Sequence, residues 1–146
     1  VTGTSTVSGI SQTKSFVIKT SSNSQAIPSW IQQGINYSTS DPTKIGLAIY
    51  APGKNYIHVI GSFNNWTVSP NYLMKRDTTN PDLFWIEITG LTSQQLYTFQ
   101  YLTSDGIRVA DPYSRLVLSP DDDPGISSTT YPNLPAYPSG QNLTFP

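Results

Sequence analysis

The chain has 146 residues, which is enough for one domain of ordinary size. Charged residues make up 12% and the net charge is −1, so the surface offers little of the basic charge that nucleic acid requires, and no nucleic-acid partner is expected. The absence of cysteine excludes disulfides and thiolate metal sites, and no run approaches the ~20 apolar residues of a membrane span.

Segments with alternating apolar and polar residues follow one another along the chain. Val, Ile and aromatic residues recur at every second position, which is the period of a strand. The predicted strands cover residues 14–20, 45–50, 56–60, 84–88, 96–102, 108–109 and 116–118. Pro52-Gly53 and Asp105-Gly106 predict tight turns. Several short strands separated by turns predict an all-β sandwich or barrel.

Composition divides the chain into three parts. Residues 1–26 are rich in Thr and Ser, and we expect an N-terminal strand and linker there, either the end of a preceding module or an extra strand of the main domain. Residues 27–118 carry the compact β-sandwich. Residues 119–146 are rich in proline and predict an extended exit segment that needs a neighbouring surface. We expect Trp30 to fasten the linker to the sandwich, and Trp85 to face solvent or a covering segment.

The most informative run is Gly61-Ser-Phe-Asn-Asn-Trp66, which follows a predicted buried strand. Asn64 and Asn65 tolerate turn conformations, so Trp66 is expected at the tip of a turn. An indole ring suits the apolar face of a pyranose, and amide groups suit its hydroxyls. The run therefore predicts a sugar-binding surface centred on Trp66. The alternative is that Trp66 packs inward and caps the sandwich, because tryptophan is usually mostly buried.

This run resembles the signature of family 48 carbohydrate-binding modules, the early-set immunoglobulin-like domains that precede the catalytic barrel in amylase-family (family 13) glycoside hydrolases. A second match follows in Tyr97-Thr-Phe-Gln-Tyr101, Asp105-Gly106 and Ala110-Asp-Pro-Tyr-Ser114. The resemblance covers roughly residues 34–137, most of the chain. It implies an antiparallel immunoglobulin-like (early set) β-sandwich, with a Pro-rich C-terminal extension that leads toward a missing catalytic barrel.

The resemblance also implies where sugar would bind. Trp66 occupies the place of a module's first tryptophan. Arg108 stands where a second tryptophan is found, and Gln100 stands where the modules carry a basic residue. With one stacking ring in place of two, we expect weak binding of α-1,4-glucan, such as starch or glycogen. The candidate carbohydrate-binding residues are Trp66, Asn65, Asn64, Gln100 and Arg108.

Catalysis by this chain is not expected. Glycoside hydrolysis needs two carboxyl groups facing one bond, whereas the chain has a single glutamate, Glu87, and its aspartates lie mainly in predicted turns. An amylase-type barrel needs ~250 residues. His58 stands alone and Asp121-Asp-Asp123 lacks the spacing of a cation-binding loop, so no metal and no cofactor are expected.

We therefore expect a non-catalytic accessory domain of a secreted bacterial α-amylase-type hydrolase, located outside the cell or at its surface. Its expected partners are the catalytic barrel of its own full-length chain and α-glucan. Low charge and many Ser, Thr, Asn and Tyr residues favour the extracellular location. A docking domain predicts a bare apolar patch involving Ile60, Trp85 or the tail. The alternative is an immunoglobulin-like spacer or adhesion module without a sugar site, which predicts a buried Trp66 and no patch.

Overall fold

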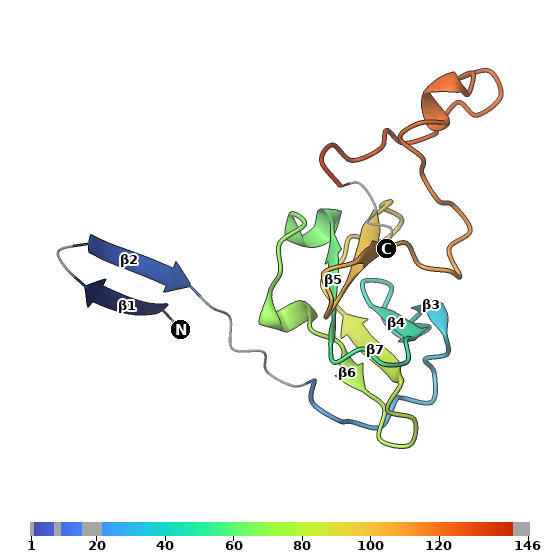
Figure 1. Cartoon of the computed structure of the whole chain (residues 1–146). Coiled ribbons are helices and arrows are strands. Elements are labelled where there is room, and N and C mark those ends of the chain that lie inside the picture. The colour runs from blue at the N-terminus through green and yellow to red at the C-terminus, as the bar shows by residue number, and fades with distance from the viewer. Residues whose placement is uncertain (1, 8–9, 16–21, 142–146) are drawn as a thin grey trace.

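The computed structural model describes residues 2–7, 10–15 and 22–141. Within these ranges the chain forms antiparallel strands and three short 3-10 helices (Figure 1). One sheet of the main domain has the order β3 (Gly34–Tyr37), β4 (Ile45–Tyr50), β7 (Leu83–Ile88) and β6 (Lys75–Arg76). The second has the order β5 (Ile57–Gly61), β8 (Phe99–Thr103) and β9 (Arg108–Val109). The two sheets enclose one core, which confirms the predicted all-β, immunoglobulin-like sandwich.

Strand register places alternate apolar residues of both sheets on the inner faces. β4 and β7 pair Leu47 with Ile86, and β5 and β8 pair Val59 with Tyr101. Residues two apart on a strand share a face, so the pairs two positions along these strands also face the core. The buried cluster consists of Leu47, Ile49, Ile57, Val59, Met74, Phe84, Ile86, Ile88 and Tyr101. Removal of these side chains from water is the main favourable contribution to folding.

The segment between η2 (Pro70–Tyr72) and β7 passes from one sheet to the other. Leu73 forms an antiparallel bridge with His58 of β5, and the Met74 amide donates to the Ile57 carbonyl oxygen across 2.9 Å. Directly afterwards, β6 pairs with β7 of the opposite sheet. One short stretch of backbone therefore fastens both sheets, and Met74 is fully buried between them.

Residues that precede β3 cover the outer face of the four-stranded sheet. Trp85 points away from the main core, yet it is fully buried in a second cluster with Ile31. Its indole Nε1 donates to the Gln25 carbonyl oxygen across 2.9 Å. Trp30 packs against this cluster, with Lys44 Nζ 5.2 Å from the centre of its ring. Trp30 thus fastens the segment to the sandwich, and Trp85 lies under a covering segment rather than in solvent.

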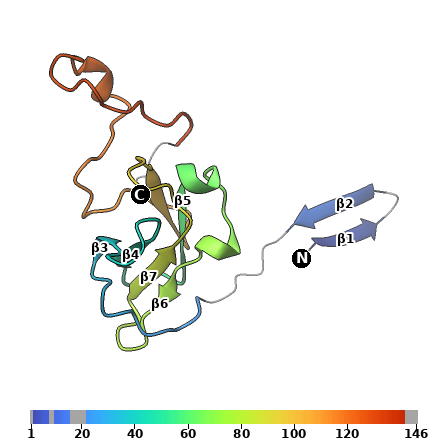
Figure 2. The same cartoon turned by 180° about the vertical axis from the view of Figure 1, so that it is seen from behind.

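An N-terminal hairpin precedes the sandwich. It consists of β1 (Thr2–Val7) and β2 (Ile10–Ser15), paired antiparallel with Val7 opposite Ile10. Figures 1 and 2 show the hairpin apart from the two main sheets. The strand predicted at residues 14–20 overlaps β2 in its first two residues, and the remainder lies outside the described residues. The division into parts 1–26, 27–118 and 119–146 stays a prediction.

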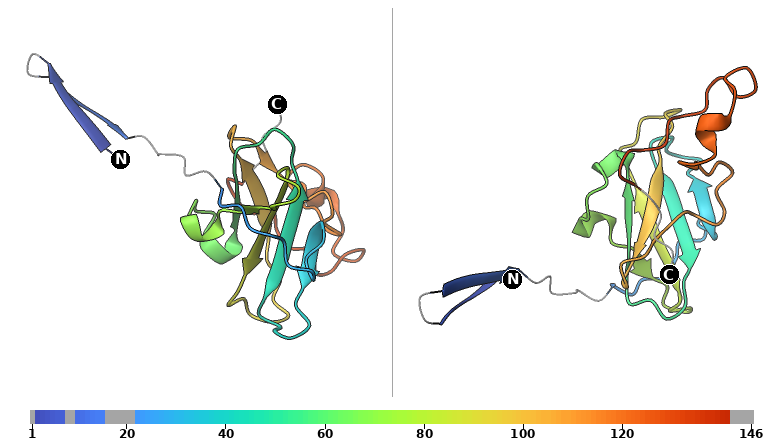
Figure 3. Two further views of the ribbon diagram at one scale, coloured as in Figure 1. Left: turned by 90° about the horizontal axis from the view of Figure 1, so that it is seen from below. Right: turned by 45° about the horizontal axis from the view of Figure 1, so that its top comes forward.

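Beyond β9 the described chain forms no further strand. It runs outward, passes through η3 (Asp123–Gly125) and returns to the second sheet, where Gln141 contacts β8 and β9 (Figure 3). The strand predicted at residues 116–118 is wrong. These residues line a pocket, and the three-stranded sheet ends at β9 without a further strand to pair with them.

Candidate functional site

The Asn64 side chain closes the turn that follows β5. Its Oδ1 accepts a hydrogen bond from the Gly61 amide across 2.9 Å, and its Nδ2 donates to the Val59 carbonyl oxygen across 3.1 Å. Between these residues lies η1 (Ser62–Asn64), a single turn of 3-10 helix. Because both ends of the Asn64 amide are engaged, this side chain shapes the turn, and a sugar hydroxyl would have to displace one of these bonds.

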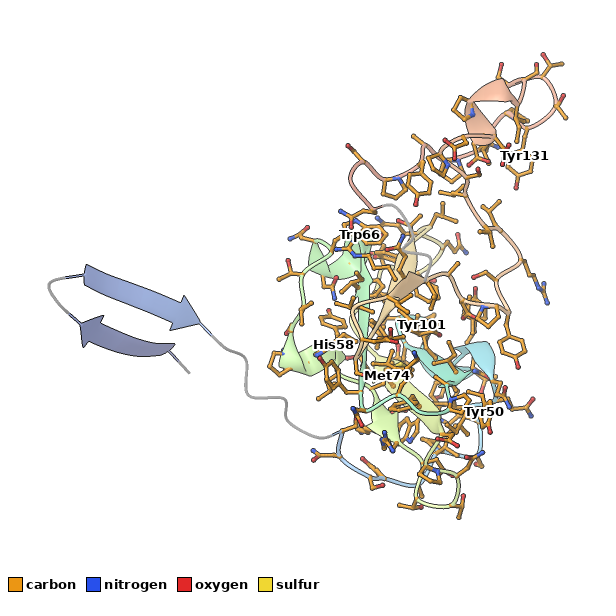
Figure 4. The ribbon with its side chains drawn as sticks, viewed as in Figure 1. Tyr50, His58, Trp66, Met74, Tyr101 and Tyr131 are labelled. Atoms are coloured by element: carbon orange, nitrogen blue, oxygen red, sulfur yellow. The ribbon has the colours of Figure 1, made fainter. Side chains whose placement is uncertain are left out.

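Asn65 and Trp66 form the end of this turn. Both have left-handed backbone conformations, with φ angles of 53° and 57°, which cost about 1–2 kcal/mol for a residue other than glycine. The Trp66 amide donates to the Gly61 carbonyl oxygen across 2.9 Å and so holds this conformation. Asn65 is exposed and Trp66 is half-buried. Figure 4 shows Trp66 at the end of the sandwich nearest the returning tail, outside the main core.

Gly61 is required in this turn because another backbone lies against it. A Cβ atom at this position would lie 2.6 Å from the Thr98 carbonyl oxygen and 2.8 Å from Phe63 Cε1. The same Thr98 oxygen accepts a hydrogen bond from the Ser62 amide across 2.9 Å. This close approach anchors the Trp66 turn to the residues that lead into β8.

A pocket of about 500 Å³ opens beside the Trp66 turn. Its walls come from β3, the Trp66 turn, the start of β8 with the residues before it, the segment after β9 and the returning tail. A pocket of this size suits a small molecule or part of a longer ligand. Of the five predicted sugar-binding residues, Trp66 and Gln100 line the pocket, whereas Asn64, Asn65 and Arg108 do not.

Gln100 carries one paired and one unpaired polar atom, and 5% of the residue is exposed. Its Nε2 donates to the Gln141 carbonyl oxygen, while its Oε1 is buried with no hydrogen-bond partner among the described residues. An unpaired buried acceptor costs about 1–3 kcal/mol. This oxygen is not exposed to solvent, so a ligand hydroxyl would reach it only after the Gln100 side chain or the tail moves. Arg108 donates from Nη1 to Gln141 Oε1 across 2.7 Å, so part of its guanidinium holds the tail.

Asp111 is a pocket residue that the sequence marks only as part of an exit segment. It is 3% exposed, and its carboxylate accepts hydrogen bonds from the Tyr101 hydroxyl across 3.2 Å and the Tyr113 amide across 2.8 Å. Loss of hydration raises the pKa of the Asp111 carboxyl above its ordinary value of 3.8, and the two hydrogen bonds oppose that rise. Asp111 lies two residues after the end of β9, and that position is the one sequence signal that could have indicated a pocket residue here.

Exposed apolar side chains surround the mouth of the pocket. This set, the rim patch, consists of Tyr37, Leu96, Tyr113, Leu116 and Val117, each 40–76% exposed. The apolar patch predicted at Ile60 and Trp85 is not found, since both residues are fully buried. The chain itself removes them from the surface: a segment before β3 covers Trp85, and the tail lies on Gln100, the cross-strand partner of Ile60.

The fold and the pocket define an immunoglobulin-like β-sandwich with an aromatic-lined pocket at the Trp66 turn. No family model matches the chain. Over 75 residues, 50% of its length, the chain is 33% identical to the 1,4-alpha-glucan branching enzyme GlgB of Burkholderia thailandensis. It is 32% and 33% identical, over 46% of its length, to the enzymes of that name from Butyrivibrio fibrisolvens and Desulfitobacterium hafniense. The chain spans 9–11% of the length of these relatives.

These relatives support the predicted resemblance in its coarser form. About half of the chain is similar to part of an enzyme whose name places it with α-glucan. The narrower resemblance to family 48 modules stays a prediction, and so does sugar binding by the five residues named from the sequence. Since the chain is about a tenth as long as these relatives, the activity of the whole enzyme is a matter for proposal.

The predicted extracellular or cell-surface location is wrong. The branching enzymes to which the chain is similar are intracellular enzymes of glycogen metabolism and are not secreted. The prediction rested on low charge and on many Ser, Thr, Asn and Tyr residues. Such a composition describes the polarity of a protein surface and does not determine the compartment in which the protein is found. In the part of the chain that the structure describes, no helix combines the length and the apolar character needed to cross a bilayer.

Proposed function

We propose that this chain is a non-catalytic accessory domain of an α-glucan-active, amylase-type enzyme. It packs on the catalytic domain of its own full-length chain and binds α-glucan weakly beside Trp66. The observation that carries the glucan site is the pocket of about 500 Å³ whose lining includes Trp66 and Gln100. The similarity to branching enzymes over half the chain supports glucan as the ligand.

The pocket offers both kinds of contact that a sugar needs. The half-buried Trp66 ring supplies an apolar face for the C–H groups of a pyranose. Polar lining residues, among them Asp111, Ser114 and Arg115, supply hydrogen-bond acceptors and donors for hydroxyls. The lining carries one acidic and one basic side chain, Asp111 and Arg115, so its formal charge is balanced, and a neutral, hydroxyl-rich ligand suits it.

The same lining argues against hydrolysis within this domain. Glycoside hydrolysis uses two carboxyl groups on either side of the reacting bond, and Asp111 is the single carboxylate among the described residues that line the pocket. Glu87, on β7, pairs with Lys44 Nζ across 2.8 Å and is not a lining residue. Binding and positioning are therefore assigned to this domain, and the reaction to another part of its enzyme.

The rim patch supports packing against another domain. Contiguous apolar groups on a surface are typical of contact sites, and part of this patch lies on the segment that leads out of the sandwich. A spacer or adhesion module without a sugar site predicts a buried Trp66 and no patch. Trp66 is instead half-buried and the patch is present, so these observations favour the accessory domain.

Titration of the chain with maltoheptaose, followed by tryptophan fluorescence, tests the glucan site. We expect saturable quenching at millimolar sugar that is lost in Trp66→Ala. Trp30→Phe is the matched control, because Trp30 packs with Trp85 on the outer face of the four-stranded sheet, and the quenching should survive. No saturable change in the folded wild-type protein at millimolar sugar would contradict the glucan site.

Charge introduced into the rim patch tests docking. Val117 lies in the patch and is 55% exposed, while Val68 lies outside it and is 52% exposed. In the isolated chain we expect Val117→Glu and Val68→Glu to leave Tm unchanged, because both side chains are at the surface. In the full-length enzyme that contains this domain, only Val117→Glu should lower Tm. Equal behaviour of the two variants in that enzyme would refute the docking surface.

A further inference from the structure

Tyr137 reaches the Trp66 pocket from a part of the chain without strands. The tail leaves the sandwich after β9, passes through η3 and returns (Figure 3). Its residues Pro135, Tyr137 and Pro138 line the pocket. Tyr137 is the aromatic member of this group and is half-buried. The pocket therefore has one aromatic ring from the Trp66 turn and another from the tail.

Hydrogen bonds centred on Gln141 hold Tyr137 in place. The Gln141 carbonyl oxygen accepts from the Tyr137 hydroxyl across 2.8 Å and from Gln100 Nε2. Its side-chain Oε1 accepts from Arg108 Nη1 across 2.7 Å. The tail, β8 and β9 thus meet at one residue, and a charged donor strengthens the contact. This network positions Tyr137 before a ligand arrives, which lowers the entropic cost of binding.

We propose that Tyr137 is a glucan-binding residue that forms a second aromatic wall of the Trp66 pocket, and that Gln141 is its positioning residue. This inference rests on the glucan function proposed above. The Gln100 amide links the two parts of the site, because Gln100 lines the pocket and its Nε2 donates to the Gln141 carbonyl oxygen in the tail. Two rings contact more of a glucan segment than Trp66 does alone.

Three other tyrosines line the pocket. Tyr37 is 76% exposed at its rim, and the hydroxyls of the other two are engaged elsewhere. The Tyr113 hydroxyl donates to Gln33 Oε1 across 2.6 Å, and the Tyr97 hydroxyl accepts from the Thr92 amide across 2.9 Å. Of these four tyrosines, Tyr137 is the one whose hydroxyl joins the network of Gln100. Arg108, predicted at the edge of the sugar site, then contributes to glucan binding through Gln141 rather than by contact with the ligand.

Calorimetric titration of the whole chain with maltoheptaose tests Tyr137. We expect Tyr137→Ala to bind about three- to tenfold more weakly, the effect of losing one aromatic contact. Tyr137→Phe keeps the ring and should bind maltoheptaose about twofold more weakly than wild type. Tyr131→Ala is the matched control: Tyr131 lies in the same tail, is 48% exposed and does not line the pocket, so its affinity should equal that of wild type. Tm should stay unchanged throughout, because the buried core cluster contains no tail residue.

NMR tests the role of Gln141. In the wild-type protein we expect intermolecular NOEs from maltoheptaose to the ring protons of both Tyr137 and Trp66. Gln141→Ala keeps the backbone carbonyl that accepts from Tyr137 and Gln100, but it removes the Oε1 acceptor through which Arg108 of β9 holds the tail. With that link lost, the NOEs to Tyr137 should weaken together with the affinity, while those to Trp66 remain. Asn133→Ala, an exposed amide residue of the same tail, should change neither. Full-strength NOEs to Tyr137 in Gln141→Ala would overturn the positioning role.

The possible outcomes separate this inference from the proposed function. Equal affinity of Tyr137→Ala and wild type, with binding lost in Trp66→Ala, would overturn Tyr137 as a binding residue and leave the proposed function standing. Tighter binding by Tyr137→Ala would show that the tail covers the pocket, which also overturns the inference. No binding by the wild type or by any variant would overturn the proposed glucan function, and the inference with it.

Discussion

The hydroxyl of Tyr101 donates a hydrogen bond to Asp111 Oδ2 across 3.2 Å, between two residues that are almost fully buried. Tyr101 belongs to the core of the sandwich, whereas Asp111 begins the segment that leaves it. The other carboxylate oxygen accepts from the Tyr113 amide, which shapes the start of that segment. The bond therefore couples the core to the wall of the candidate pocket. Burial raises the pKa of the Tyr101 hydroxyl well above 10.

Replacement of Asp111 by asparagine should change how stability depends on pH. In the folded state the pKa of the Asp111 carboxyl is raised above 3.8, so the folded protein binds this proton more tightly than the unfolded protein does. The contribution of Asp111 to the free energy of unfolding therefore falls as pH rises from 3.8 through the raised pKa. Asp111→Asn should lack that fall. Urea unfolding of both proteins from acidic to neutral pH measures it, and parallel pH profiles would contradict the prediction.

Asp77 should contribute to stability with the opposite dependence on pH. Its carboxylate accepts hydrogen bonds from the Thr79 hydroxyl and from the Ile27 amide. These bonds, that from Thr79 with the larger effect, lower the pKa of Asp77 from 3.8 to about 2. A lowered folded pKa means that the contribution is present above pH 3.8 and is lost as pH falls toward about 2. Asp77→Asn should lack this acid loss and be less stable at neutral pH. Asp121→Asn, at an exposed carboxyl of the tail, is the control for urea unfolding.

Removal of the Trp85 ring should detach the segment that covers the four-stranded sheet. The fully buried side chain fills the second cluster and donates to the Gln25 carbonyl oxygen. Trp85→Ala should lower the free energy of unfolding by about 3–5 kcal/mol. Tyr50→Ala, at a half-exposed position on the neighbouring strand β4, should change it by less than about 0.5 kcal/mol. Urea unfolding gives both values, and faster hydrogen exchange of the Ile31 amide in Trp85→Ala would report the detachment.

A methyl group at Gly61 should disturb the Trp66 turn. The added Cβ would lie 2.6 Å from the Thr98 carbonyl oxygen, a backbone atom that cannot move without shifting β8. Gly61→Ala should therefore lower stability by about 1–3 kcal/mol. Gly125→Ala is the matched control, because a Cβ atom there would meet no atom within 4 Å, and Tm should stay close to that of wild type. Equal Tm values for the two variants would contradict the close approach.

Strand periodicity predicts most of the sandwich. The run at residues 45–50 coincides with β4, and the runs at 56–60 and 84–88 differ from β5 and β7 by at most one residue at each end. The periodicity misses β3 and β6, because β3 contains a glycine and mixed polarity and β6 has two residues, too few to show a period. Residues 116–118 have the composition of a strand but lack a neighbouring strand to pair with.

The candidate site was predictable in one part. The run at residues 61–66 predicts the turn that presents Trp66, because Asn64 shapes it through bonds to neighbours three and five residues away. Asp111 and Tyr137 carry no local pattern that marks them as pocket residues. They reach the pocket through the exit and return of the tail, which depend on contacts with residues far away in the sequence.

By itself the sequence determined the all-β class, the left-handed turns at Gly53 and Gly106 and the position of Trp66 at a turn, since alternation and backbone preference act within a few residues. Tertiary structure alone decided that Trp85 lies under a covering segment and that Tyr137 shares a pocket with Trp66. It also decided that a buried oxygen of Gln100 has no partner among the described residues. These features arise where distant segments pack together, and the free energy of such packing depends on partners that no local pattern identifies.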